Sequence, residues 1–106
     1  MSAKKITKYD LIDSVSEKSR CEKKLAQAVL ENFLDELRFF LSEGTTVELR
    51  GFGTFEARFR KGRTKARNPK TGEQLSVAPH YVAAFRAGQD LKNALRRLPI
   101  ESNGTE

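Results

Sequence analysis

Cysteine, histidine and tryptophan are almost missing from this chain of 106 residues, which has one, one and none of them respectively. A single cysteine cannot form an internal disulfide or a multi-thiolate metal site, and one histidine is too few for most zinc sites. No apolar run approaches the length of about 18 residues that a transmembrane helix needs. The sequence therefore excludes disulfide-rich scaffolds and membrane spans, and we expect neither a metal nor a cofactor.

Signals for secretion and for catalysis are also lacking. The first residues, Met-Ser-Ala-Lys-Lys, have no apolar core of a signal peptide, so we expect a cytoplasmic protein. Gly51 and Gly53 are not followed by the third glycine and the helix of a phosphate-binding loop. His80 is expected in an exposed loop after Pro79, and Cys21 is expected to make a small apolar contact. We therefore predict that the protein is not an enzyme and takes no small-molecule substrate.

Positive charge, by contrast, is abundant and unevenly placed. The chain has 20 Lys and Arg against 14 Asp and Glu, a net charge of +6. Seven of the basic residues and no acidic one lie within residues 58–70, so 13 basic and 14 acidic residues remain elsewhere. A run of charge is usually only a solvated surface. Here four of the seven are arginines, which favour forked contacts with phosphate, and the run leads to a proline. The pattern favours nucleic acid as the partner.

Two helices are predicted in the first half of the chain. Thr7 and Asp10 have the spacing of a capping box at the start of a short helix. Ser19-Arg-Cys-Glu22 repeats that spacing and predicts the start of a long helix, which continues to about Glu43. Gly44 is then the natural left-handed residue at its end.

The apolar face of the long helix is unusually broad. At 100° per residue its apolar side chains spread over roughly 180° of the circumference, whereas packing on a single core needs about 100°. The residues concerned are Leu25, Ala26, Val29, Leu30, Phe33, Leu34, Leu37, Phe40 and Leu41. The helix is either buried at the centre of its own subunit or covered by a second chain. The second interpretation is favoured because few other apolar residues remain.

A two-stranded ribbon is predicted in the second half. Thr46–Arg50 alternates apolar and polar residues, and a turn or bulge within Gly51–Phe55 resets the alternation before the strand continues through Phe59. Asn68–Gly72 has the residues of a hairpin turn, and a second strand runs over residues 73–81. A cationic ribbon fits a nucleic-acid groove, and a proline at its tip can enter a base step.

A short helix is predicted over Ala87–Leu98, because Leu91, Leu95 and Leu98 share one face and Pro99 stops it. Three motifs then resemble a known family. They are Gly51-Phe-Gly-Thr-Phe55, Arg67-Asn-Pro-Lys-Thr-Gly-Glu73, and Phe85-Arg-Ala-Gly88 with Leu91-Lys92. Over roughly residues 7–97 the chain is similar to the HU and integration host factor family of bacterial DNA-bending proteins, architectural binders of the minor groove.

The resemblance implies a fold and a function. The fold is α+β: an intertwined dimer with a helical body, an antiparallel β-sheet and long β-ribbon arms. The function is that of a nucleoid-associated protein that binds duplex DNA in the minor groove and bends and compacts it, with low or modest sequence specificity. The chain then divides into an N-terminal extension (residues 1–6), the DNA-bending domain (7–98, with the arm at about 58–76) and a C-terminal tail (99–106).

The resemblance also implies the site residues, with Pro69 as the wedge between base pairs. The DNA-binding residues of the arm are Arg58, Arg60, Lys61, Arg63, Lys65, Arg67, Asn68, Pro69 and Lys70. Those of the body are Lys8, Lys23, Arg50, Gly88 and Lys92. The residues of the dimer core are Leu30, Phe33, Leu34, Leu37, Phe52, Phe55 and Phe85.

Several alternatives stay open at this point. The arm between Phe55 and Pro69 is one residue longer than in the commonest members of the family, which leaves the groove-facing side chains undecided. Glu48-Leu-Arg50 is closer to the β subunit of integration host factor, which favours a site-specific accessory factor for recombination or transcription. A homodimer is expected, with a heterodimer of paralogues as the alternative. A small RNA-binding or ribosome-associated module is a further interpretation.

Overall fold

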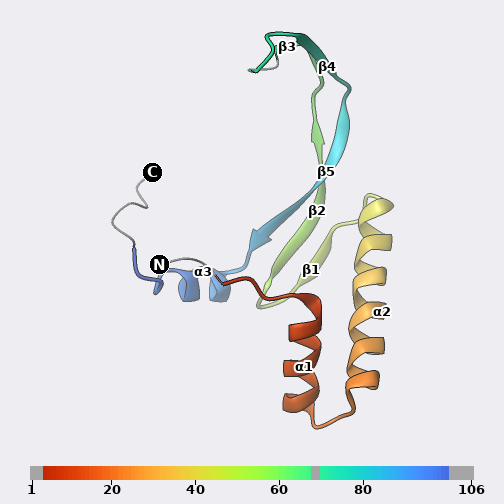
Figure 1. Cartoon of the computed structure of the whole chain (residues 1–106), viewed down its shortest axis with the longest axis vertical. Helices are drawn as coiled ribbons and strands as arrows, with labels where there is room; N and C mark the ends of the chain where they lie inside the picture. The colour runs from red at the N-terminus through yellow and green to blue at the C-terminus, as the bar shows by residue number, and fades with distance from the viewer. Residues whose placement is uncertain (1–3, 68–69, 101–106) are drawn as a thin grey trace. The chain divides into compact units, whose positions relative to one another are not determined.

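The computed structural model describes residues 4–67 and 70–100, with the backbone alone for residues 64–67, 74 and 75. Over these residues the chain forms three helices and five strands, in the order α1, α2, β1, β2, β3, β4, β5, α3 (Figure 1). It divides into two compact units, Met1–Phe39 with Arg97–Glu106, and Phe40–Arg96. No helix in the described ranges has the length and apolar character needed to cross a membrane.

Helix α1 (Lys8–Ser19) begins at the predicted capping box. The hydroxyl of Thr7 accepts a hydrogen bond from the backbone N–H of Asp10 at 3.3 Å, and the Asp10 carboxylate accepts one from the backbone N–H of Thr7 at 3.0 Å. These bonds satisfy two N–H groups that the first helical turn would otherwise leave open. The bond from the Thr7 N–H, and next a bond from the Thr7 hydroxyl, hold the pKa of the Asp10 carboxyl below its usual value.

The link between α1 and α2 differs from the prediction. Ser19 does not cap the second helix, because it is still the last residue of α1. Arg20 adopts a left-handed conformation (φ 55°) and its N–H donates to the carbonyls of Ser16 and Glu17, which closes α1. Helix α2 (Lys23–Ser42) therefore starts later than predicted, and the Glu22 carbonyl accepts its first bond, from Ala26. Ser19 and Glu22 have the spacing of a capping box, but the left-handed turn at Arg20 ends α1 within this segment.

Within the first unit, α1 and α2 are joined by two ion pairs. Lys8 Nζ is 3.1 Å from a carboxylate oxygen of Glu31, and Lys23 Nζ is 3.1 Å from one of Asp13. Among the described residues, the buried apolar side chains of the chain are those of Ile12 and Ala26 alone. The two helices therefore leave most of their apolar side chains uncovered.

The second unit contains a three-stranded antiparallel sheet in the order β1-β2-β5. Strand β1 (Val47–Leu49) is followed by a turn in which Gly51 has φ 85°, and β2 (Gly53–Arg60) returns beside it. The predicted glycine turn is thus confirmed. Strand β5 (His80–Ala87) pairs with all of β2, from Gly53 opposite Ala87 to Arg60 opposite His80. The sequence indicated only the first residues of β5, and His80 lies in this strand and not in a loop.

The outer ribbon is formed by β3 (Arg63–Arg67) and β4 (Gln74–Val77). Their register shifts between Arg63 and Ala66, where β3 has one more residue than β4. Such a bulge accommodates an extra residue in one strand of a pair. Gly62 lies between β2 and β3, and a side chain there would overlap the Val77 carbonyl and Pro79. The ribbon strands of the prediction are therefore each interrupted, at residues 61–62 and 78–79.

The ends of α2 and α3 were predicted with unequal success. Gly44, with φ 83°, terminates α2 as expected, and its N–H donates to the Leu41 carbonyl. Helix α3 (Gln89–Leu95) is shorter than predicted. It begins after Gly88 and ends before Arg96, so Leu98 lies outside the helix and Pro99 is not what stops it.

Candidate nucleic-acid interface

The sheet in the second unit has two chemically different faces. Side chains of residues that are opposite each other in an antiparallel pair lie on the same face. The cationic face is made by Arg58 and Arg60 of β2 and by His80 and Arg86 of β5, with Glu56 among them. The apolar sheet face is made by the residues that alternate with these; its large side chains are those of Val47, Leu49, Phe55, Phe59, Tyr81 and Phe85.

Glu56 is an acid at the centre of the cationic face. Its carboxylate accepts hydrogen bonds from Arg58 at 2.6 Å and from Arg86 at 3.4 Å. The bond from Arg58 holds the pKa of Glu56 below its usual value; burial opposes this shift, and the positive charge of Arg86 adds to it. Glu56 thus partly neutralises and positions two arginines at the base of the arm. Sequence reasoning missed both contacts. The one with Arg86 depends on the register of β2 and β5, and the one with Arg58 joins two residues of β2 that are two positions apart.

Further along the arm the cations have no acid beside them. Within the described part of the chain, no carboxylate bonds Arg60, Lys61 or Arg63. Arg60 shares a face with Arg58, whereas Arg63 lies in the separate two-stranded sheet of β3 and β4, opposite Val77. Unpaired arginines on an exposed ribbon form a surface that an anionic polymer can approach.

The described part of the chain does not include all of the predicted arm residues. Asn68 and Pro69 lie outside the described residues, and so do the side chains of Lys65 and Arg67. Lys70 is exposed beside the turn, in which Gly72 has the positive φ expected of it, 76°. The wedge role of Pro69 stays a prediction.

Three of the predicted body residues already make contacts within the chain. Lys8 is bonded to Glu31, and Lys23 to Asp13, so each must exchange a carboxylate for a phosphate in order to contact DNA. The Gly88 N–H already donates to the Phe52 carbonyl at 2.8 Å. Two further body residues, Arg50 and Lys92, are exposed. Within the described residues no group of His, Cys, Asp or Glu could hold a metal ion.

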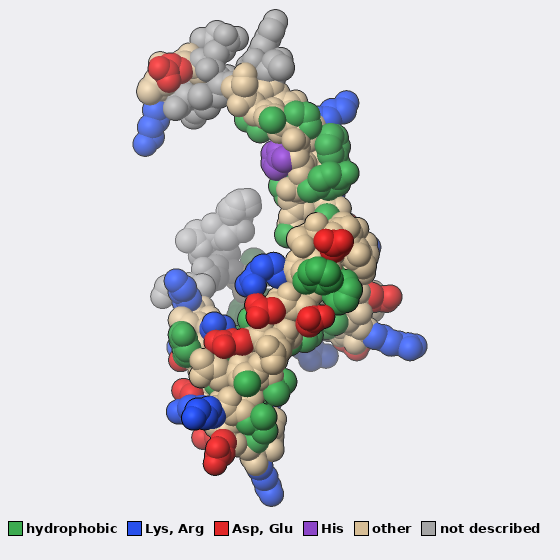
Figure 2. Space-filling model, turned by 90° about the vertical axis from the view of Figure 1, so that its right-hand side faces the viewer, with side chains coloured by type: hydrophobic (Ala, Val, Ile, Leu, Met, Phe, Trp, Pro, Cys, Tyr) green, Lys and Arg blue, Asp and Glu red, His purple; other side chains and the backbone are tan. Residues whose placement is uncertain are grey.

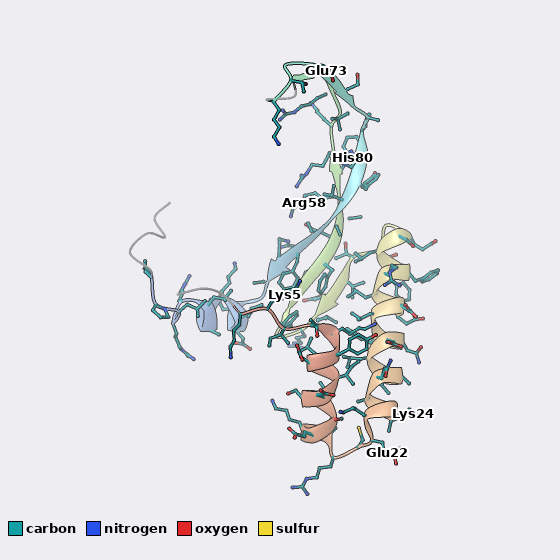
Figure 3. The ribbon with its side chains drawn as sticks, in the orientation of Figure 1. Lys5, Glu22, Lys24, Arg58, Glu73 and His80 are labelled. Atoms are coloured by element: carbon teal, nitrogen blue, oxygen red, sulfur yellow. The ribbon has the colours of Figure 1, made fainter. Side chains whose placement is uncertain are left out.

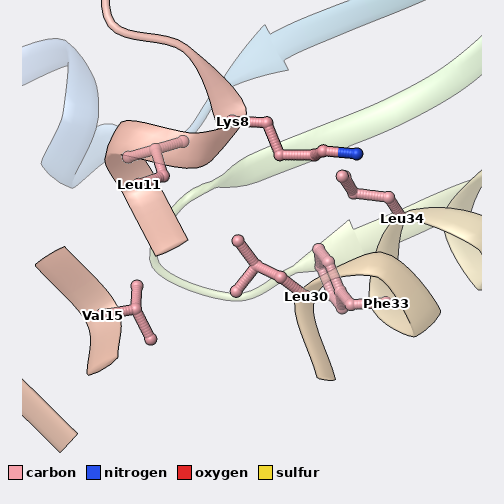
Figure 4. A pocket seen from close by; sticks show the side chains of 6 residues that line it. All are labelled: Lys8, Leu11, Val15, Leu30, Phe33 and Leu34. Atoms are coloured by element: carbon pink, nitrogen blue, oxygen red, sulfur yellow. The ribbon is translucent and has the colours of Figure 1, made fainter. Parts of the chain in front are cut away.

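The predicted dimer-core residues of the first unit line an open hollow. Leu30, Phe33 and Leu34 of α2, with residues of α1, surround about 430 Å³ (Figure 4). Phe33 is 48% exposed and Leu34 37%. Large apolar side chains rarely stay this accessible as a contiguous surface on a monomer. Leu37, further along α2, is half-buried.

In the second unit the apolar core is aromatic. Phe85 packs against Phe52 and Phe55, with ring centroids 5.4 and 4.7 Å apart. Phe52 and Phe85 nevertheless remain 47% and 42% exposed. Phe59 and Tyr81 form an edge-to-face pair with centroids 5.4 Å apart, which sequence reasoning had not identified. Figure 2 shows hydrophobic side chains at the surface along this part of the chain.

Comparison with known proteins decides the family. Residues 6–96 match the family described as "Bacterial DNA-binding protein". The chain belongs to this family. It is 44% identical to the integration host factor subunit alpha of Pasteurella multocida over 97 residues, 92% of this chain and 98% of the relative. It is 43% identical to the DNA-binding protein HU of Haemophilus influenzae, over 86% of this chain and all of the relative.

Solved structures agree with this assignment. An Anabaena HU–DNA cocrystal structure has a TM-score of 0.80 and 40% identity, and the match covers 88% of this chain and 100% of that one. HU from Thermotoga maritima has a TM-score of 0.61 and 26% identity, with 85% and 98% covered. The α+β fold of the HU and integration host factor family, predicted from three motifs, is confirmed.

Proposed function

We propose that this protein is a nucleoid-associated architectural protein that binds duplex DNA in the minor groove, bends it and compacts it, with low or modest sequence preference. The observation that carries the proposal is the arm itself. It is an exposed antiparallel ribbon on which Arg60, Lys61 and Arg63 have no carboxylate partner among the described residues. Membership of a DNA-binding family supports the same conclusion.

The chemistry of the arm accounts for binding and bending separately. Lysine and arginine that neutralise phosphates release condensed counterions, which drives association with little regard to sequence. Pro69, the wedge of this proposal, then separates two base pairs. Unstacking costs a few kcal/mol and is offset by the longer contact that bent DNA makes with the protein. Flexible, nicked or distorted duplexes should be preferred, because less deformation remains to be supplied.

The binding form is a dimer, and we expect two copies of this chain. A single copy buries only Ile12 and Ala26 among its described apolar residues, which is too little to stabilise a domain of this size. The predicted core residues Phe33 and Leu34 in the first unit, and Phe52 and Phe85 in the second, all keep more than a third of their surface exposed. A second copy would supply the missing cover. We also retain the division into residues 1–6, 7–98 and 99–106 as part of this proposal.

A charge-matched pair of variants tests the DNA-binding surface. In the arm variant Arg60, Lys61 and Arg63 become Ala; the control replaces three exposed cations outside the arm, Lys18, Arg38 and Arg97. The slope of log affinity against log salt should flatten by about 0.9 for each phosphate that is no longer neutralised, about five units for a dimer in which six are affected. The control should keep most of the parent slope. Equal slopes for both variants would contradict an arm-based interface.

A site-specific accessory factor is the second candidate. Support comes from relatives named as integration host factor subunits and from Arg50, which is exposed in the turn between β1 and β2. Footprinting on genomic DNA separates the candidates. A discrete protected site that Arg50→Ala abolishes favours the second, whereas a featureless pattern, unchanged by the substitution, favours the first.

A further inference from the structure

The only histidine of the sequence lies on the cationic face. His80 is opposite Arg60 in the register, and the next pair on this face is Val82 with Arg58. The side chain is exposed, as the purple atoms in Figure 2 show, and Figure 3 labels it on the arm with Arg58. Its Nδ1 is 2.9 Å from the Ala78 carbonyl oxygen. The Nε2 atom has no partner among the described residues.

We propose that His80 is a proton-controlled DNA contact, which binds a backbone phosphate beside Arg60 as the cationic imidazolium and releases it as the neutral ring. The inference rests on the proposed function, because it assigns a further residue to the same surface. Histidine is the side chain whose charge ordinarily changes between pH 5 and 8. One contact of the arm would therefore respond to pH while the arginines beside it stay charged.

The charged groups around His80 determine the direction of the effect. From β2, Arg60 faces it directly and Arg58 lies further along the same face. The acids on this face are Glu56, whose carboxylate is already bonded by Arg58 and Arg86, and Glu48 at the far end, opposite Thr54. Strand β4 (Gln74–Val77) has no charged residue.

No described carboxylate is therefore placed to neutralise a His80 cation. A phosphate of bound DNA is an anion that can neutralise this cation, because opposite charges stabilise one another. Binding then takes up a proton. By linkage, affinity for DNA rises as the pH falls across the range in which histidine side chains ordinarily gain a proton.

Three proteins separate this role from a structural one: the parent, His80→Asn as a neutral replacement and His80→Lys as a permanent cation. Their affinity for one labelled random-sequence duplex is measured by fluorescence anisotropy at pH 5.5 and 7.5 over a range of salt. The parent should bind on the order of tenfold more tightly at pH 5.5 at about 0.1 M salt, with a salt slope steeper by about 0.9 per subunit.

The affinity of each variant for the duplex should be the same at both pH values, low for one variant and high for the other. His80→Asn should bind at both pH values as the parent does at pH 7.5, and His80→Lys as the parent does at pH 5.5. All three share the same terminal amine, cysteine and carboxylates, so other titrations cancel. A parent whose affinity is independent of pH, or a His80→Asn variant that keeps the pH dependence, overturns the inference alone. Failure of all three to bind duplex at either pH overturns the proposed function with it.

Discussion

Replacement of Phe33 by Ala tests whether a second copy covers the hollow between α1 and α2. Phe33 is 48% exposed in the single chain. A phenylalanine can bury roughly 200 Å², so covering the exposed half removes about 100 Å² from water in each subunit. At about 25 cal/mol per Å² this contributes roughly 2.5 kcal/mol per subunit, or about 5 kcal/mol per dimer. Phe33→Ala should remove most of that free energy of unfolding.

The assay is urea unfolding followed by circular dichroism at two protein concentrations. A folded dimer gives a midpoint that rises with protein concentration, because association stabilises the folded state by mass action. Ile100→Ala is the control, since Ile100 is 93% exposed and follows the last helix. It should leave the midpoint unchanged. A parent midpoint that is independent of protein concentration, together with equal effects of the two substitutions, would contradict the prediction that a second copy covers Phe33.

Three further outcomes are expected. Pro69→Ala should reduce the bend angle of bound DNA more than it reduces affinity, whereas Pro99→Ala should change neither; weaker affinity with an unchanged bend, measured by fluorescence resonance energy transfer, would contradict the wedge. Thr7→Ala should lower the free energy of unfolding by about 1 kcal/mol, because it removes the N-cap of α1; an unchanged urea midpoint would show that the cap is dispensable. The pKa of Glu31 is lowered, first by a hydrogen bond from Gln27 and then by Lys8, so its contribution to stability is present above its usual pKa and is lost as the pH falls through the lowered value. Glu31→Gln should flatten the acid limb of stability against pH in thermal melts, and an unaltered limb would contradict this.

The features that the sequence predicted well are those with local causes. The capping box at Thr7 depends on residues three apart, and the left-handed Gly44 on a residue type that favours this conformation. The broad apolar face of the long helix is a property of one element, and the exposure of Phe33 and Leu34 agrees with it. In each case the deciding interaction lies within one helix or at its end.

The errors have non-local causes. Ser19 has the spacing of a cap, but Arg20 took the left-handed conformation that usually belongs to glycine, and its residue type gave no sign of this. Strand β5 contains alanines with weak preference for strands and is held by pairing along the whole of β2. The ion pair of Glu56 with Arg86 follows from that pairing, whereas the one with Arg58 joins residues two apart in β2.

The most direct measurement is the end-to-end distance of a short doubly labelled duplex as the protein is added at low salt. If the lone cationic arm grips DNA and opens it at the tip, the two ends must approach each other in the bound complex and separate again as salt is raised. A duplex that stays unbound at low salt, or that is bound and remains straight, would contradict the account.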